Sequence, residues 1–229
     1  KNVVPVLQEI ISINPAVKIM ASPWSAPAWM KTSNRISGAG RLRLGEYVGN
    51  GYRYQDTIDY VYAQYFVKFI AAYAKLGIRI SSVTMQNEPS NGCPWPITVW
   101  TPEELTKWGS EYLRPAFDRS FPDVEIYFGD DSLRFWQRPA SEYMTPVQAA
   151  CFAGAAFHTY SGLPVWVHNG TRQFPGWKAV MTERRCMLDE SVDEASHVMF
   201  GEIGNWLVRN GVGLINLWNM ALDEIGRAH

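Results

Sequence analysis

The feature that most constrains the fold is the alternation of short apolar runs with longer helical segments. Six runs rich in β-branched or apolar residues occur at about 17–22, 78–86, 124–129, 151–159, 178–182 and 212–218. Most of them are separated by segments with helical periodicity. Strands that alternate with helices form a parallel sheet, because each helix returns the chain to the same end of the sheet. The sequence therefore predicts an α/β fold with six parallel strands.

Three helices are expected between these strands. The clearest covers 56–76, where apolar residues recur at three- and four-residue steps and Gly77 follows at a typical helix end. A second begins at Thr101, with Pro102 at the first helical position and Glu104 closing a capping box. The third covers roughly 189–209. The Glu103–Glu104 pair is thereby explained as part of a helix start.

Composition excludes several classes of function. The 229 residues carry a net charge of −1 with both signs interspersed, so nothing favours nucleic acid or an anionic membrane surface. No run reaches the roughly 18 apolar residues of a membrane span, and no basic-then-apolar leader opens the chain. Cys93, Cys151 and Cys186 lie far apart without zinc-like spacing. We expect no metal site and no cofactor, and one domain over 1–229, since nothing marks a boundary.

Aromatic residues supply a positive clue. They form 14% of the chain and include ten Trp. Seven of these lie in expected loops: Trp24, Trp29, Trp95, Trp100, Trp136, Trp166 and Trp177. Each could equally fill the core, but loops rich in Trp favour ligands with flat apolar faces, such as pyranose rings.

Two glutamates stand at the ends of predicted strands. Glu88 follows the run 78–86 and precedes Pro89, and Glu183 follows the run 178–182. Parallel strands present functional residues at their carboxyl ends, so both carboxylates should lie at one rim. A glutamate at a strand end is more often an ion-pair partner than a catalyst. Two of them on one rim match the pair that retaining glycoside hydrolysis needs, about 5–5.5 Å apart.

Several segments resemble glycoside hydrolase family 30, the glucosylceramidase and endo-β-1,6-glucanase group. They are Ala21-Ser-Pro-Trp-Ser-Ala-Pro-Ala-Trp-Met-Lys31, Tyr65-Phe-Val-Lys-Phe-Ile70, Val83-Thr-Met-Gln-Asn-Glu-Pro89, Ala156-Phe-His-Thr-Tyr-Ser-Gly162, Thr182-Glu183 and Leu217-Trp-Asn-Met-Ala-Leu-Asp-Glu224. They follow the family's order and cover nearly the whole chain. The resemblance implies a (β/α)8 TIM-barrel type of fold.

The resemblance also implies roles for single residues. Glu88 would be the general acid/base and Glu183 the nucleophile, while Asn87 would hydrogen-bond the sugar 2-hydroxyl. Trp29, His158, Tyr160 and Trp218 match positions that line the sugar pocket. The segment Asp130-Asp131-Ser132 matches a loop that contacts sugar in the family.

Substrate and location follow the same resemblance. The implied activity is retaining hydrolysis of β-glucosyl substrates, with glucosylceramide favoured, β-1,6-glucan next, and an endo-β-xylanase of the same family as an alternative. The partner would be a carbohydrate or glycolipid, with no nucleic acid and no membrane span. The family implies a secreted or extracytoplasmic protein.

The chain departs from the family in two respects. Arg184 and Arg185 follow Glu183, where many relatives have small residues; they could lower the pKa of Glu183 or simply be solvated. The runs correspond to strands 3–8 of the barrel, so the first two βα units and the usual accessory β-sandwich are expected to be missing.

Two alternatives belong to other classes. A non-catalytic carbohydrate-binding fragment would keep the Trp-rich face without a closed barrel. A nucleotide-binding α/β protein is suggested by Gly38-Ala-Gly40, but Arg43 stands where the third glycine of the motif belongs. The glycine-rich stretch 38–51 is better interpreted as a mobile βα loop over the sugar site.

Overall fold

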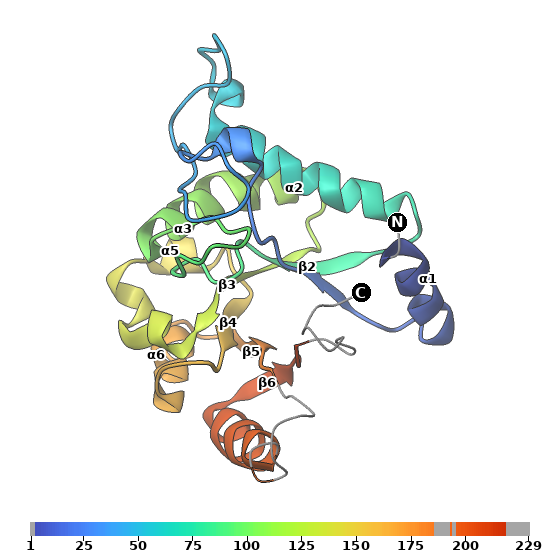
Figure 1. Cartoon of the computed structure of the whole chain (residues 1–229), viewed down its shortest axis with the longest axis vertical. Helices are drawn as coiled ribbons and strands as arrows, with labels where there is room; N and C mark the ends of the chain where they lie inside the picture. Colours follow the sequence, from blue (N-terminus) through green and yellow to red (C-terminus); the bar gives the residue numbers. More distant parts are fainter. Residues whose placement is uncertain (1–2, 186–192, 194–195, 219–229) are drawn as a thin grey trace.

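The computed structural model describes residues 3–185, 193 and 196–218, and its centre is one parallel sheet (Figure 1). The strands are β1 (Ile19–Ala21), β2 (Ile80–Thr84), β3 (Glu125–Ser132), β4 (Gly154–His158), β5 (Lys178–Glu183) and β6 (Val212–Ile215). They are ordered β1-β2-β3-β4-β5-β6, and every neighbouring pair is parallel. The prediction of six parallel strands is confirmed, and the sheet forms a half-barrel, as a partial (β/α)8 barrel does.

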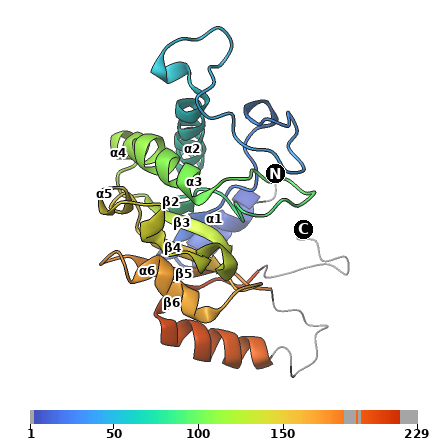
Figure 2. The ribbon, with the colours of Figure 1, turned by 90° about the vertical axis from the view of Figure 1, so that its left-hand side faces the viewer.

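Helices lie along the outer side of the curved sheet (Figures 1 and 2). The α-helices are α1 (Val3–Ile13), α2 (Ile58–Ala74), α3 (Pro102–Trp108), α4 (Arg114–Ser120), α5 (Pro146–Ala149) and α6 (Val167–Thr171). Two π-helical segments are η3 (Gly109–Leu113) and η7 (His197–Leu207), and the 3-10 turns are η1 (Ala28–Met30), η2 (Tyr54–Asp56), η4 (Leu133–Gln137), η5 (Ala140–Glu142), η6 (Pro164–Trp166) and η8 (Val208–Asn210). Among the described residues, no helix is long and apolar enough to cross a membrane.

The expected helix starts and ends are largely found. Thr101 caps α3: its hydroxyl accepts from the Glu104 amide at 3.2 Å, and the Glu104 carboxylate accepts from the Thr101 amide at 2.9 Å. The first expected helix is α2. The third, over 189–209, is described only in part, because residues 189–192 and 194–195 lie outside the described residues. The part that is described is π-helical η7 followed by a 3-10 turn.

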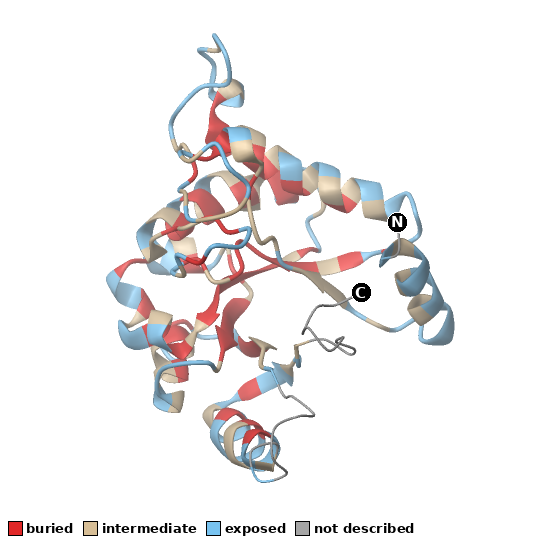
Figure 3. Ribbon diagram, viewed as in Figure 1, coloured by how far each residue is buried: buried red, intermediate tan, exposed pale blue. Residues whose placement is uncertain are grey.

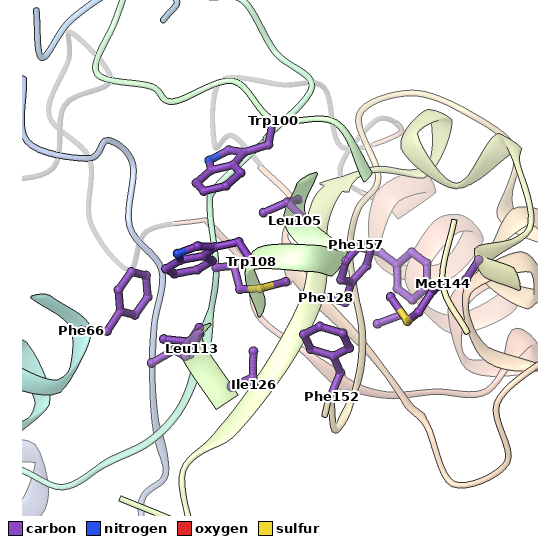
Figure 4. Close-up of a cluster of buried hydrophobic side chains, with 14 of the residues drawn as sticks. Phe66, Trp100, Leu105, Trp108, Leu113, Ile126, Phe128, Met144, Phe152 and Phe157 are labelled. Carbon is purple, nitrogen blue, oxygen red and sulfur yellow. The ribbon is translucent and has the colours of Figure 1, made fainter. Parts of the chain in front are cut away.

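Alternate strand residues face opposite sides of the sheet, as a period of two requires. Phe128, Phe157 and Met181 belong to the large core cluster, and Figure 4 labels Phe128 and Phe157 within it. Figure 3 colours the buried parts of the strands and helices red. Tyr127 and Val180, offset by one residue, belong to a smaller cluster on the other face. The main core therefore lies between sheet and helices, and this packing fixes the rim from which the loops extend.

The long loop between β1 and α2 is tied to the loop after β2. Lys31 is fully buried, and its ammonium donates to the carbonyls of Ile36, Gly38 and Ile97 at 3.0, 3.3 and 2.6 Å. Pro96 forms β-bridges with this first loop at Ser37 and Gly38. The start of the stretch interpreted as a mobile loop is thus anchored by a buried charge and backbone pairing.

Candidate active site

Glu88 and Glu183 meet at the carboxyl rim of the sheet, as the sequence predicts. Glu183 is the last residue of β5, and Glu88 lies four residues beyond the end of β2. One carboxylate oxygen of each, and a ring nitrogen of His158, all lie within 4.8 Å of one another. Glu88 has a left-handed backbone (φ 46°), and its amide donates to the Asp130 carbonyl at 2.8 Å. The tight turn after β2 therefore aims Glu88 across the rim.

His158, the last residue of β4, bridges two carboxylates. Its Nδ1 lies 3.2 Å from Glu88 Oε1, and its Nε2 lies 3.1 Å from Asp130 Oδ1. The pKa of His158 is raised to about 10: burial opposes the charge, but the hydrogen bonds to Asp130 and Glu88 outweigh it. The ring is an imidazolium at neutral pH. Because both nitrogens are engaged, His158 orients Glu88 and leaves no nitrogen free for a sugar or a metal ion.

Asp130 has a role that the sequence did not predict. Residues 130–132 were expected in a sugar-contacting loop, but they continue strand β3, and Asp130 is only 1% exposed. Its carboxylate accepts from the hydroxyls of Ser22, Thr84 and Thr182 as well as from His158. Burial opposes its charge, yet the contacts with His158, Ser22 and Thr182 hold the pKa of Asp130 below its usual range. Asp130 is thus the buried counter-charge of the site.

Asp131 points elsewhere and fixes the loop that carries Glu88. Its carboxylate accepts from the amide and hydroxyl of Ser90 at 2.8 and 2.7 Å. Burial raises the pKa of Asp131, with the Ser90 contacts opposing. On the same loop, the Asn91 side chain donates to Glu88 Oε2 at 2.8 Å. Both contacts restrain the position of Glu88.

Tyr160 is the hydrogen-bond partner of Glu183. Its hydroxyl donates to Glu183 Oε1 at 3.0 Å. Burial nevertheless raises the pKa of Glu183, against the lowering effects of His158 and the Tyr160 hydroxyl. Arg184 pairs with Glu202 instead of Glu183, at 2.8 Å, and Arg185 is exposed. The arginines do not outweigh the effect of burial, because the net shift of the Glu183 pKa is upward.

The two candidate catalytic carboxyls therefore have different proton affinities. The pKa of Glu88 is lowered, chiefly by the hydrogen bond from His158 and also by Asn91, with burial opposing. Of the two carboxyls, Glu183 therefore binds a proton more readily than Glu88, the reverse of the order implied by the family roles. Two carboxyls so close influence each other's titration.

Two tryptophans that follow the first and last strands pack against each other: the ring centroids of Trp24 and Trp218 lie 5.6 Å apart. Trp29, on η1, is 51% exposed. The resemblance implied pocket positions for Trp29 and Trp218, whereas Trp24 was only one of seven tryptophans in expected loops. Asn87 is almost fully buried, and its backbone N–H donates to the Pro23 carbonyl at 2.8 Å. That bond ties the loop carrying Trp24 to the strand end carrying Glu88.

The sequence and the fold of the chain resemble those of known proteins. The glycosyl hydrolase family 30 TIM-barrel domain matches residues 1–207. The mouse lysosomal acid glucosylceramidase is 32% identical over 163 residues, covering 69% of this chain and 30% of that protein. The endo-1,6-β-D-glucanase neg1 of Aspergillus fumigatus is 31% identical over 232 residues, covering 93% and 44%.

Similarity of fold extends to solved structures. The crystal structure of SrfJ from Salmonella typhimurium superimposes with a TM-score of 0.81 at 24% identity, covering 99% of this chain and 49% of that one. The chain thus spans less than half the length of each of these three proteins. Since the family domain matches most of its residues, the chain belongs to glycosyl hydrolase family 30.

Proposed function

We propose that this chain carries the catalytic carboxylates of a retaining β-glycoside hydrolase, with Glu183 as nucleophile and Glu88 as general acid/base. The observation that supports this is the separation of the two carboxylates, whose nearer oxygens lie within 4.8 Å. Retaining enzymes hold their carboxyl groups about 5–5.5 Å apart, whereas inverting enzymes need about 6.5–9.5 Å to admit a water. The spacing favours direct attack on the anomeric carbon.

The first step then has a definite proton route. Glu183 attacks the anomeric carbon as Glu88 protonates the leaving oxygen, and a glycosyl ester forms on Glu183. For this step Glu88 carries the proton and Glu183 is ionised, and the positive charge that grows on the sugar in the transition state is stabilised by the Glu183 carboxylate. The imidazolium of His158 holds Glu88 in place. In the second step Glu88, now ionised, takes a proton from the water that hydrolyses the ester.

For the substrate we propose a β-glucoside, with glucosylceramide ahead of β-1,6-glucan. The names of the mouse and Aspergillus relatives support these two classes. The aromatic pair Trp24–Trp218 offers flat apolar surface to a sugar ring. Trp95, 44% exposed on the loop after β2, could contact the group beyond the scissile bond. A hydrolysis panel of glucosylceramide, β-1,6-glucan and glucuronoxylan distinguishes them from the xylanase alternative.

Covalent trapping tests the mechanism directly. A 2-deoxy-2-fluoro-β-glucoside with an activated leaving group should form a stable ester, and peptide mass spectrometry should locate it on the peptide containing Glu183. Glu183→Ala should abolish trapping, and added azide should restore turnover of an aryl β-glucoside as the α-glycosyl azide. A label on Glu88, or a β-glycosyl azide, would exchange the two roles. If the chain showed neither a covalent label nor turnover, the non-catalytic carbohydrate-binding alternative would be favoured.

A further inference from the structure

Arg184 is a departure from the family pattern that the proposed mechanism does not use. It follows Glu183 directly, at the end of β5. Its guanidinium makes two hydrogen bonds to the Glu202 carboxylate, Nε to Oε2 at 2.8 Å and Nη2 to Oε1 at 3.1 Å. Glu202 belongs to η7 (His197–Leu207). The side chains of Arg184 and Glu202 are only 18% and 12% exposed. A forked pair with so little exposure has a fixed geometry.

The same guanidinium lies over the ring of Tyr160. Its central carbon is 5.7 Å from the ring centroid, within the range of a cation–π contact. The Tyr160 ring is 39% exposed, so protein contacts restrain it on only part of its surface. His158 supplies another contact, edge-on at 6.1 Å. Arg184 thus covers the ring whose hydroxyl donates to Glu183.

The backbone of Arg184 forms a hydrogen bond with the segment that carries Trp218. Its carbonyl accepts from the Trp218 amide at 3.0 Å. The Arg184 side chain therefore connects η7 with Tyr160, and the Arg184 backbone connects the end of β5 with the segment that carries Trp218. Both connections lie next to the proposed nucleophile.

We propose that Arg184 is a positioning residue for the nucleophile: anchored by Glu202, it holds the Tyr160 ring so that the hydroxyl donates to Glu183. This inference rests on the proposed function for its kinetic consequence, but its geometry can be tested without activity. Arg184 touches neither sugar nor reacting atoms in this role. It acts through Tyr160, and the Tyr160 hydrogen bond favours the ionised form of Glu183.

Kinetics of single and double variants test the path. Arg184→Ala should lower kcat/KM on an aryl β-glucoside by between about two- and thirtyfold, the range for a cation–π contact. The acidic limb of its pH profile should move to higher pH, because Glu183 loses a donor and becomes harder to ionise. Tyr160→Phe should move the limb in the same direction, and adding Arg184→Ala to it should change little more. Additive losses, or an unmoved limb, would overturn the inference.

Arg185→Ala is the matched control. It removes the same charge one residue further on, from an exposed side chain, and should leave both kcat/KM and the acidic limb unchanged. Arg184→Lys keeps the charge but lacks the planar fork, and should resemble Arg184→Ala. An effect of Arg185→Ala equal to that of Arg184→Ala would reduce the role to general electrostatics and contradict the inference.

Crystal structures provide a readout that does not depend on turnover. In Arg184→Ala the Tyr160 hydroxyl should lie beyond hydrogen-bond distance of Glu183, whereas in Arg185→Ala it should stay within it. An unmoved Tyr160 in Arg184→Ala would overturn the inference whatever the activity. If the crystal structures agree with it but Glu183→Ala retains the turnover of the unmutated chain, the proposed function fails and the positioning geometry stands.

Discussion

His158 Nε2 lies 3.1 Å from Asp130 Oδ1, and each of these side chains is only 1% exposed. An imidazolium and a carboxylate are therefore paired out of contact with water. Such a pair tolerates its burial only while every polar atom is satisfied, which the three hydroxyls around Asp130 accomplish. The geometry of Glu88 depends on this pair, because His158 uses its other nitrogen to hold Glu88.

Asp130→Asn should be strongly destabilising. The amide cannot neutralise the buried imidazolium, and breaking one side of a buried ion pair typically costs about 3–5 kcal/mol. Ser22→Ala is the milder comparison, since it removes one hydroxyl donor and should cost about 1 kcal/mol. Urea unfolding of the three proteins measures both losses. Equal midpoints for Asp130→Asn and Ser22→Ala would show that the charge of Asp130 matters no more than one hydrogen bond.

The stability of the fold should fall in alkaline solution. The pKa of His158 is raised to about 10 in the folded protein, above its ordinary value near 6.5. Its contribution is complete below about pH 6.5 and is lost as the pH rises towards 10, because the unfolded chain releases that proton earlier. Thermal unfolding at pH 6 and pH 9.5 should show the lower midpoint at pH 9.5. His158→Gln should flatten this dependence, and an equally steep profile in that variant would assign the effect to other groups.

Glu88→Gln should discriminate among leaving groups. General acid catalysis contributes roughly 10²–10⁴-fold, and it matters most when the leaving oxygen is basic. Hydrolysis of an alkyl β-glucoside should therefore slow far more than that of a dinitrophenyl β-glucoside. Steady-state kinetics on both substrates gives the ratio. The same factor on each would remove Glu88 from the general-acid role.

Gly154→Ala should destabilise the sheet at its tightest contact. A Cβ at Gly154, the first residue of β4, would meet the Lys178 backbone carbonyl oxygen at 2.0 Å, so the strands would have to separate. Overpacking of this kind typically costs about 1–3 kcal/mol. Gly213→Ala, in β6, is the control, since no atom lies within 4 Å of its added Cβ. Thermal unfolding should rank the two, and a Gly213→Ala protein no more stable than Gly154→Ala would contradict the steric explanation.

The sequence predicted the parts of the site that depend on local pattern. Glu88 and Glu183 could be found because each stands at or just after the end of a predicted strand, and parallel strands end at one rim. Thr101 and Glu104 were likewise predictable, because a capping box is complete within four residues. The strand ends were predicted less well. Strand β3 continues three residues past its predicted end, and the prediction stopped early because the polar sequence Gly-Asp-Asp-Ser resembles a loop.

The unpredicted parts depend on residues distant in sequence. Asp130 has hydroxyl partners near the ends of β1, β2 and β5, up to 108 residues away, and no local pattern shows that these would satisfy a buried charge. The same applies to Arg184, whose partner Glu202 lies 18 residues further along the chain, in η7. Nothing in the periodicity of η3 and η7 distinguishes their π-helical geometry from an α-helix.

A β-bulge in β3 shifts the register of this strand against β4. Gly129 pairs with Ala156 and Asp131 with Phe157, so Asp130 is an extra residue, with a left-handed backbone (φ 65°), that has no partner on β4. Because of this bulge the two consecutive aspartates make different contacts: Asp130 pairs with His158, and Asp131 accepts hydrogen bonds from Ser90. Deleting Gly129 would shift the register of Asp130 and Asp131 relative to β4 and exchange or abolish their contacts, although the net charge of the chain would stay the same. In this strand, therefore, a one-residue deletion should be more damaging than most substitutions, because it changes which residues pair with β4 and which face of the sheet each side chain occupies.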